Sequence, residues 1–240
     1  MPILVVKDKR TKTLAASFVP EKGCETFAVK WSGAFLQRMG HTGVVNKSDG
    51  EPAIKALKQK AAEEVGVVSI PEESVPYDSK SNGEIESAVK EVKGMIRATK
   101  IALVTNLGFQ LERTDPMLAW TPTYSADMIS RHRIAPDGNT AERRRTGRHW
   151  RRPTFEYGEL IFYKVVTSKA KKKRGGYDAV MKEGRYLGHH GRTGALLVMT
   201  AEGVQRGSGA RRMPEERRWS KEGWDKLRGF PWEVQPRQRS

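Results

Sequence analysis

Residues 77–96 of the chain read YDSKSNGEIESAVKEVKGMI. A loop of polar and turn-forming residues leads here into a helix, and the carboxylate of Glu86 stands where the helix begins. Ser81 or Asn82 is suited to cap this helix, because a short polar side chain can accept hydrogen bonds from the first free backbone amides. The sequence therefore places an acid at the head of a helix in a strongly basic chain.

The helix that carries Glu86 has an apolar face and a charged face. The apolar face is formed by Ile85, Val89, Val92, Ile96 and Leu103. Basic residues follow Glu86 at offsets that keep them on its own face, since a helix turns by about 100° per residue; they are Lys90, Lys93, Arg97 and Lys100. Two interpretations are open: a ridge that binds a polyanion, or a solvated face with one Glu–Lys pair worth a few tenths of a kcal/mol.

Strand-like and helix-like segments alternate before this helix. The apolar periodicity predicts a hairpin of residues 2–7 and 13–19, a helix over 25–39, a strand over 43–47, a helix over 51–65 and a strand over 67–70. Asp49 follows the third of these strands and lies 86−49=37 residues before Glu86. The order predicts an α/β fold in which Asp49 and Glu86 can meet only through tertiary structure.

The pattern of apolar and turn-forming residues changes in the second half of the chain. A helix is predicted over 116–134, followed by short alternating runs with glycine-rich turns that indicate a small β-barrel. We therefore divide the chain into an α/β core (1–135), a basic linker (136–153), a barrel (154–209) and a charged tail (210–240). His189 and His190 are adjacent, so they should point to opposite faces of a strand, and we expect them to be exposed barrel residues and no metal pair.

The charge is concentrated in one half of the chain. The net charge is +16; residues 1–130 hold 17 Lys and Arg against 16 Asp and Glu, and residues 131–240 hold 27 against 12, a division of +1 and +15. Such a positive field favours binding of a polyanion such as nucleic acid, although a solubilising surface would have the same composition.

A single cysteine, Cys24, excludes an internal disulfide and a cysteine zinc site. No apolar run is long enough for a membrane span or a signal peptide, so we expect an intracellular protein with no membrane or disulfide-linked partner.

Two motifs together resemble the catalytic segments of retroviral and retrotransposon integrases, those of copia-type elements most closely. Residues 77–96 are similar to the family's last catalytic segment, with a tyrosine, a polar loop, Ser-x-Gly-x-x-Glu and a helix with lysines. NKSDGEP, residues 46–52, is similar to the turn that carries the family's second aspartate. The resemblance covers residues 2–165 and implies a ribonuclease-H-like core followed by a small Src-homology-like β-barrel.

The resemblance also implies an activity and a site. Asp49 and Glu86 would be catalytic ligands of Mg²⁺ or Mn²⁺ in a two-metal phosphodiester transfer that inserts retrotransposon DNA into target DNA. DNA of the element ends would lie along Tyr77, Asn82, Lys90, Lys93, Arg97 and Lys100. The implied partners are element-end and target DNA and a second copy of the chain, and the implied location is the nucleus.

One part of the family's pattern has no counterpart. The family's first aspartate lies on a strand upstream of the position of Met1, and Asp8 falls in a hairpin turn where the resemblance places no ligand. We therefore expect an N-terminally truncated core without its central strand and without catalysis by this chain alone. Each backbone group left unpaired and buried beside the gap would cost about 1 to 3 kcal/mol.

Two other functions are compatible with the same residues. A non-catalytic basic nucleic-acid-binding protein derived from a transposable element would bind DNA independently of Asp49 and Glu86. A ribonuclease of the same fold would share the metal site without needing the basic barrel.

Overall fold

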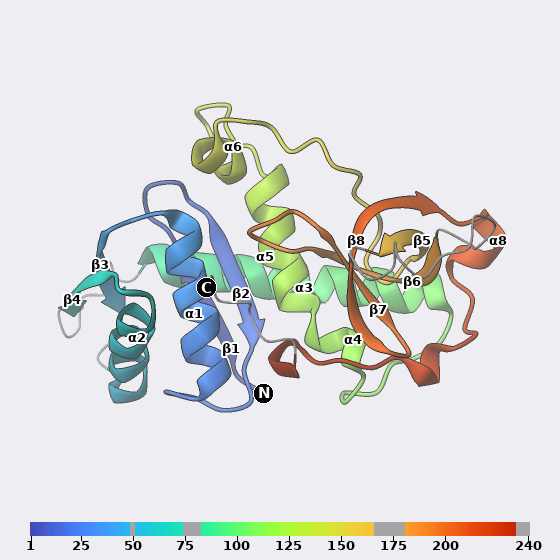
Figure 1. Ribbon diagram of the computed structural model, residues 1–240, viewed down its shortest axis with the longest axis horizontal. Coiled ribbons are helices and arrows are strands. Elements are labelled where there is room, and N and C mark those ends of the chain that lie inside the picture. Colours follow the sequence, from blue (N-terminus) through green and yellow to red (C-terminus); the bar gives the residue numbers. More distant parts are fainter. Residues whose placement is uncertain (49–50, 74–82, 166–180, 234–240) are drawn as a thin grey trace, which may run out of the picture.

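The computed structural model describes residues 1–48, 51–73, 83–165 and 181–233. They form a layered α/β part followed by a closed β-barrel, and the long helix α3 runs behind both (Figure 1). The α/β part contains β1 (Ile3–Lys7), β2 (Leu14–Phe18), α1 (Thr26–Met39), β3 (Gly43–Ser48), α2 (Pro52–Val65), β4 (Val68–Glu73), α3 (Gly83–Leu107), α4 (Pro116–Ala119) and α5 (Thr121–His132). The remaining elements are α6 (Ala141–Thr146), β5 (Leu160–Val165), β6 (Lys182–His189), β7 (Leu196–Thr200), β8 (Gly203–Arg212), α8 (Glu215–Arg218) and the 3₁₀ helices η1 (Trp224–Lys226) and η2 (Pro231–Glu233).

β1 and β2 form the predicted antiparallel hairpin, and Asp8 closes its turn. The Asp8 carboxylate accepts hydrogen bonds from the backbone amide (2.7 Å) and the hydroxyl (2.6 Å) of Thr11, and His41 Nε2 lies 3.1 Å from its other oxygen. Burial raises the pKa of Asp8, but the bonds from Thr11 and His41 outweigh it and hold the pKa below its usual value. Asp8 therefore stabilises the turn, as expected of an aspartate at a turn position.

The hairpin is covered by helices on both faces. On one face Leu14 and Ala16 pack against Val92 of α3 and Ala126 of α5. On the other face Leu4 and Val19 pack in a cluster with residues of α1 and α2. Figure 1 shows α1 in front of the hairpin and α3 behind it, which is the three-layer arrangement of an α/β fold.

β3 and β4 form a separate two-stranded parallel sheet. α2 packs against β4, and the sheet leaves Val45, Val68 and Ile70 between 59% and 67% exposed. In the described ranges β1 pairs only with β2, and β3 only with β4. The α/β class is confirmed, but the described strands of this part do not join into the one sheet that a complete ribonuclease-H-like core would have.

α3 connects the α/β part to the barrel. Its first half packs on the hairpin through Val92, and its second half packs on barrel and tail residues through Leu103 and Leu107. Gly158 approaches the helix closely, because a Cβ built there would lie 2.4 Å from Leu103 Cδ1, and its φ of +81° is one that side-chain-bearing residues rarely adopt. Glycine is therefore required where the chain passes from the linker into the barrel.

The predicted small barrel is present as a closed four-stranded barrel in the order β5-β6-β7-β8, with β5 pairing with β8 to close it. All its pairings are antiparallel. The register shifts between Tyr186 and Gly188, which bends β6 as β-bulges do. Tyr163, Tyr186 and Val198 fill the interior with at most 1% of their surface exposed.

Two helical regions differ from the sequence-based prediction. The helix predicted over 116–134 is two helices, α4 and α5, with the break at Trp120, whose indole nitrogen donates to the carbonyl of Gly229 (2.9 Å). The basic linker contains the short helix α6, capped by Thr140, whose hydroxyl accepts from the backbone amide of Arg143 (3.1 Å).

The described part of the tail packs back onto the molecule. Trp224 is 8% exposed, and its indole nitrogen donates to Asp115 Oδ2 at 2.8 Å. The guanidinium of Arg185 lies 5.0 Å from the centre of the Trp224 ring and donates to backbone carbonyls of Arg218 and Ser220. Desolvation lowers the pKa of Arg185 to about 10. Trp224 and Arg185 thus attach the tail to the barrel.

No helix in the described ranges has the length and apolarity to cross a bilayer. Cys24 is half-buried and has a free thiol.

Candidate nucleic-acid interface

The start of α3 is held against the hairpin by ion pairs. Glu84 lies 3.0 Å from Lys7 Nζ and 2.7 Å from Lys12 Nζ. The hydrogen bond from Lys12, with the one from Lys7, lowers the pKa of Glu84 against the opposing effect of burial. Glu86, two positions beyond on the same turn, is exposed to solvent. Glu84 therefore has a structural partner on the hairpin, and the side chain of Glu86 faces solvent.

The predicted basic face of α3 is an exposed ridge. Its four side chains are all solvent-exposed, and none forms a salt bridge with a described residue; they are Lys90, Lys93, Arg97 and Lys100. The opposite face is buried through Val92 (0% exposed) and Leu103 (1%). We call these four residues the α3 ridge. Their charges are available to a phosphate backbone, because no described carboxylate neutralises them.

The linker adds a second group of exposed arginines. Arg143, Arg148 and Arg151 are exposed, and no salt bridge joins them to a described residue. Neighbouring arginines have structural partners instead: Arg145 pairs with Glu142 at 2.8 Å, and Arg152 Nη1 donates to the carbonyl of Gly194 at 2.7 Å. The linker is thus fixed by some of its arginines and presents the others to solvent.

The remaining predicted site residues lie outside the described ranges. They are Asp49, Tyr77 and Asn82. Of the two predicted metal ligands, only Glu86 is described, and no group of three His, Cys, Asp or Glu side chains in the described part could hold a metal ion. The described residues therefore do not by themselves fit a divalent metal centre.

A buried ionic cluster between α5 and the linker was not predicted. Arg131 Nη2 lies 2.9 Å from Asp127 Oδ2, with both side chains at most 8% exposed, and the Arg131 guanidinium lies 3.9 Å from the centre of the Trp150 ring. Burial raises the pKa of Asp127, against the opposing charges of Arg131 and Arg38. The four-residue spacing of Asp127 and Arg131 is visible in the sequence, but nothing in the periodicity shows that this face of α5 is covered.

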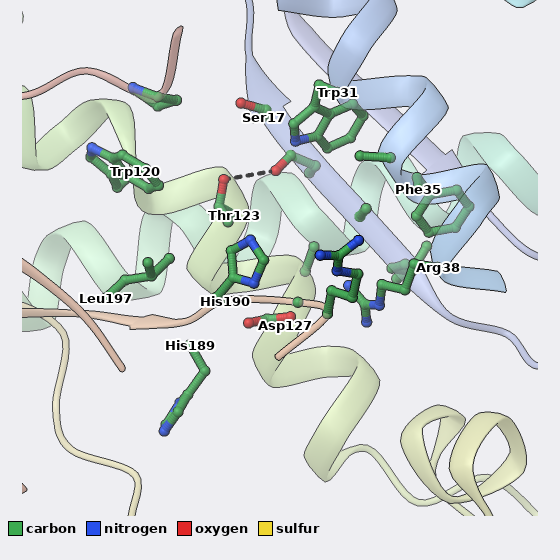
Figure 2. A pocket seen from close by; sticks show the side chains of 18 of the residues that line it. Ser17, Trp31, Phe35, Arg38, Trp120, Thr123, Asp127, His189, His190 and Leu197 are labelled. Atoms are coloured by element: carbon green, nitrogen blue, oxygen red, sulfur yellow. Dashed lines mark hydrogen bonds between the residues drawn. The ribbon is translucent and has the colours of Figure 1, made fainter. Parts of the chain in front are cut away.

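The two barrel histidines differ from the expectation. They do point in opposite directions (Figure 2), but His189 is 2% exposed and His190 is half-buried, so the prediction that both are exposed is wrong. His189 accepts or donates a hydrogen bond at 2.9 Å with the Tyr186 hydroxyl and packs edge-on against Trp150. Burial, followed by the charge of Arg131, lowers the pKa of His189 to about 3. The bulge in β6 and the linker packed above it account for this burial.

No protein-family model and no curated protein matches the chain. Among solved structures, it is similar to the catalytic core domain of BIV integrase, with 18% identity and a TM-score of 0.41 over 60% of this chain and 85% of that one. It is also similar to a simian T-cell lymphotropic virus intasome in complex with PP2A regulatory subunit B56 gamma, with 13% identity and a TM-score of 0.41 over 88% of this chain and 72% of that one. At these values neither likeness decides the fold or the function, which rest on the elements and side chains themselves.

Proposed function

We propose that this chain binds DNA through the α3 ridge and the exposed arginines of the linker. The observation that carries the proposal is the α3 ridge itself: four exposed cations on one helix face, with no described acidic partner, on the helix that joins the α/β part to the barrel. Lys and Arg side chains arranged in this way replace the counterions of a phosphate backbone, which drives association without base recognition. The net charge of +15 on residues 131–240 adds to the same attraction.

The proposal is tested by removing one ridge charge. Lys93→Met should weaken binding to a mixed-sequence duplex and reduce the slope of log K against log salt by about 0.9, the effect of one lost phosphate contact. The matched control is Lys60→Met on α2, which also removes one exposed lysine charge. Fluorescence anisotropy of a labelled duplex measures both variants. Equal affinities and slopes for the two would contradict a role for the ridge.

Integrase-type transfer of phosphodiester bonds is the second candidate, with a retrotransposon origin and Mg²⁺ or Mn²⁺ as cofactor. It is favoured by the exposed carboxylate of Glu86, which heads the α3 ridge from the first turn of the helix. In this candidate Asp49 and Glu86 hold the metal, while Tyr77 and Asn82 lie along the DNA strand. The protein would then act in the nucleus as an assembly of several copies.

Substitution of the two acids separates the candidates. If the chain only binds DNA, Asp49→Asn and Glu86→Gln leave affinity unchanged or slightly tighter, and no DNA strands are joined in Mg²⁺ or Mn²⁺. If it is a transferase, the unsubstituted chain joins labelled DNA ends to a target duplex in the metal, and either substitution abolishes the product. Both outcomes are read on one gel with the same DNA.

A further inference from the structure

A pocket lies between the α/β part and the barrel, away from the α3 ridge. Its walls come from β2, α1, α5 and the turn between β6 and β7, and its volume is about 180 Å³. Figure 2 shows Arg38 reaching from α1 toward the turn that carries His190, while His189 points to the other side. Segments far apart in the sequence therefore build one cavity with both cationic and aromatic side chains in its walls.

The pocket has a cationic wall. Arg38, Arg192 and Arg206 line it together with His190. Burial, followed by the charges of Arg206, Arg192 and Arg38, lowers the pKa of His190 to about 4. An anion placed there would meet positive charge from three elements.

Two nitrogen atoms of Arg38 are buried in the pocket without a described hydrogen-bond partner. Its Nε and Nη2 atoms are buried and have no hydrogen-bond partner in the described part of the chain. Its guanidinium lies against Gly191, where a Cβ would come within 2.4 Å of Nη1. The one carboxylate in the lining, Asp127, is already paired with Arg131. Buried donors without an acceptor are costly, so a bound anion would satisfy groups that the described chain leaves unsatisfied.

The pocket lining also includes apolar and aromatic side chains. Its lining includes Trp31 and Phe35 of α1, Trp120 at the start of α5, and Leu197 of β7. Phe35 and Trp120 are about 5% exposed, so their positions are fixed by packing. A cavity of 150 Å³ lined by apolar residues is large enough for benzene, and 180 Å³ leaves room for one ring and a small head group.

We propose that this pocket binds a small organic phosphate in which one planar ring lies against Trp31, Phe35 and Trp120 and the phosphate is held by Arg38 and Arg192. Arg206 completes the cationic wall. The ligand could be a free single-ring phosphate or the pyrimidine nucleotide of a nucleic acid, since the two share this chemistry. This site is distinct from the α3 ridge, because none of the four ridge residues lines the pocket.

Isothermal titration calorimetry with phenyl phosphate as the probe tests the site. We expect phenyl phosphate to bind with a dissociation constant well below those of phenol and inorganic phosphate, because each of these lacks one half of the ligand. Thymidine monophosphate and a 5′-phosphorylated thymidine octamer distinguish the sources: tighter binding of either identifies a nucleotide, and tighter binding of phenyl phosphate identifies a free single-ring phosphate. Equal affinity for phenyl phosphate and inorganic phosphate, or no heat with any probe, overturns the proposal.

Two charge-matched variants make the test specific. Arg38→Met should raise the dissociation constant for phenyl phosphate by about tenfold or more while retaining duplex binding, because it removes a charge-assisted hydrogen-bond donor from the pocket alone. Arg97→Met on the α3 ridge should weaken duplex binding and leave the dissociation constant for phenyl phosphate unchanged. Thermal melts confirm that both variants fold. If Arg38→Met binds the probe as tightly as the unsubstituted chain, the site is not where we place it, whatever the duplex measurements show.

Discussion

Single residues decide how the linker is attached to the α/β part. Arg131 is enclosed between the carboxylate of Asp127 and the ring of Trp150, and these three side chains come from α5 and the linker. A buried guanidinium can be held in this way only if a charge and a polarisable surface replace its water. The Asp127–Arg131 pair therefore fixes the entry to the basic linker.

Removing Arg131 should be strongly destabilising. Arg131→Met leaves the Asp127 carboxylate buried without its partner, and we expect the free energy of unfolding to fall by about 3 to 5 kcal/mol. Urea denaturation followed by circular dichroism measures it. Arg133→Met, which removes an exposed arginine that pairs with Glu91, is the matched control and should cost at most about 1 kcal/mol. Similar losses in the two variants would show that the cluster does not act as a buried ion pair.

His189 should make the fold sensitive to mild acid. Its pKa is about 3 in the folded chain and about 6.5 when unfolded, so the unfolded state takes up the proton first as the pH falls. The contribution of His189 to the free energy of unfolding is complete above pH 6.5 and is lost as the pH falls from 6.5 to about 3. His190, with a pKa of about 4, acts in the same direction.

We therefore expect the free energy of unfolding to be lower at pH 5 than at pH 7, with His189 alone accounting for about 1 to 2 kcal/mol. Denaturation at the two pH values measures this loss, and it should be smaller in His189→Gln. The range stops at pH 5 because the stability that Asp8 and Glu84 supply through their lowered pKa values is present at neutral pH and is lost mainly below pH 5. A chain that is equally stable at both values would show that His189 is not buried in its neutral form.

Residue-level roles were only partly visible in the sequence. The charged face of α3 follows from the helical repeat alone, and the structure places Glu86 and the four ridge residues in solvent as a charged face requires. The burial of Arg131 and His189 depends on the linker and the barrel covering α5, which are contacts between segments distant in the sequence. Hydrophobic periodicity cannot report such contacts, because polar residues carry no periodic signal for burial.

At the scale of elements, α3 is the helix on which the two parts of the molecule meet. Its apolar face is continuous, but Val92 packs against the hairpin and Leu103 packs on the barrel side. The sequence predicts the apolar face of α3, but it does not predict that the two halves of this face pack against different parts of the molecule. The break between α4 and α5 was also missed, although Pro122 in the first turn of α5 is a sequence signal for a helix start.

Truncation of Leu103 should uncouple the barrel from α3. The side chain is 1% exposed and lies against Gly158, so Leu103→Ala leaves a cavity and should cost about 2 to 5 kcal/mol of unfolding free energy. Ile101→Ala, at a position 67% exposed on the same helix, should cost far less and serves as the control. Chemical denaturation compares the two. An equal effect at both positions would mean that α3 does not pack on the barrel as described.

At the scale of the whole molecule, the architecture combines an α/β part, a closed barrel and a strongly asymmetric charge. The α/β class and the small barrel were predicted from periodicity and turn residues, since both are local signals. The packing of the tail through Trp224 and the pocket at Arg38 were not, since both depend on how the two parts meet. The integrase resemblance rests on the two acidic motifs, and Asp49, the acid of one of them, lies outside the described residues.

The salt dependence of duplex binding by the full chain decides whether the α3 ridge and the linker arginines bind DNA. If the α3 ridge and the exposed linker arginines together contact about six phosphates, log K should fall with log salt at a slope of about −5. Fluorescence anisotropy between 50 and 200 mM KCl, about the range over which such contacts are usually resolved, supplies the slope. A slope steeper than about −3 supports a protein that binds DNA through its charged surfaces. A slope between 0 and about −1, or no binding at the lowest salt, would show that the α3 ridge and the linker arginines do not bind DNA.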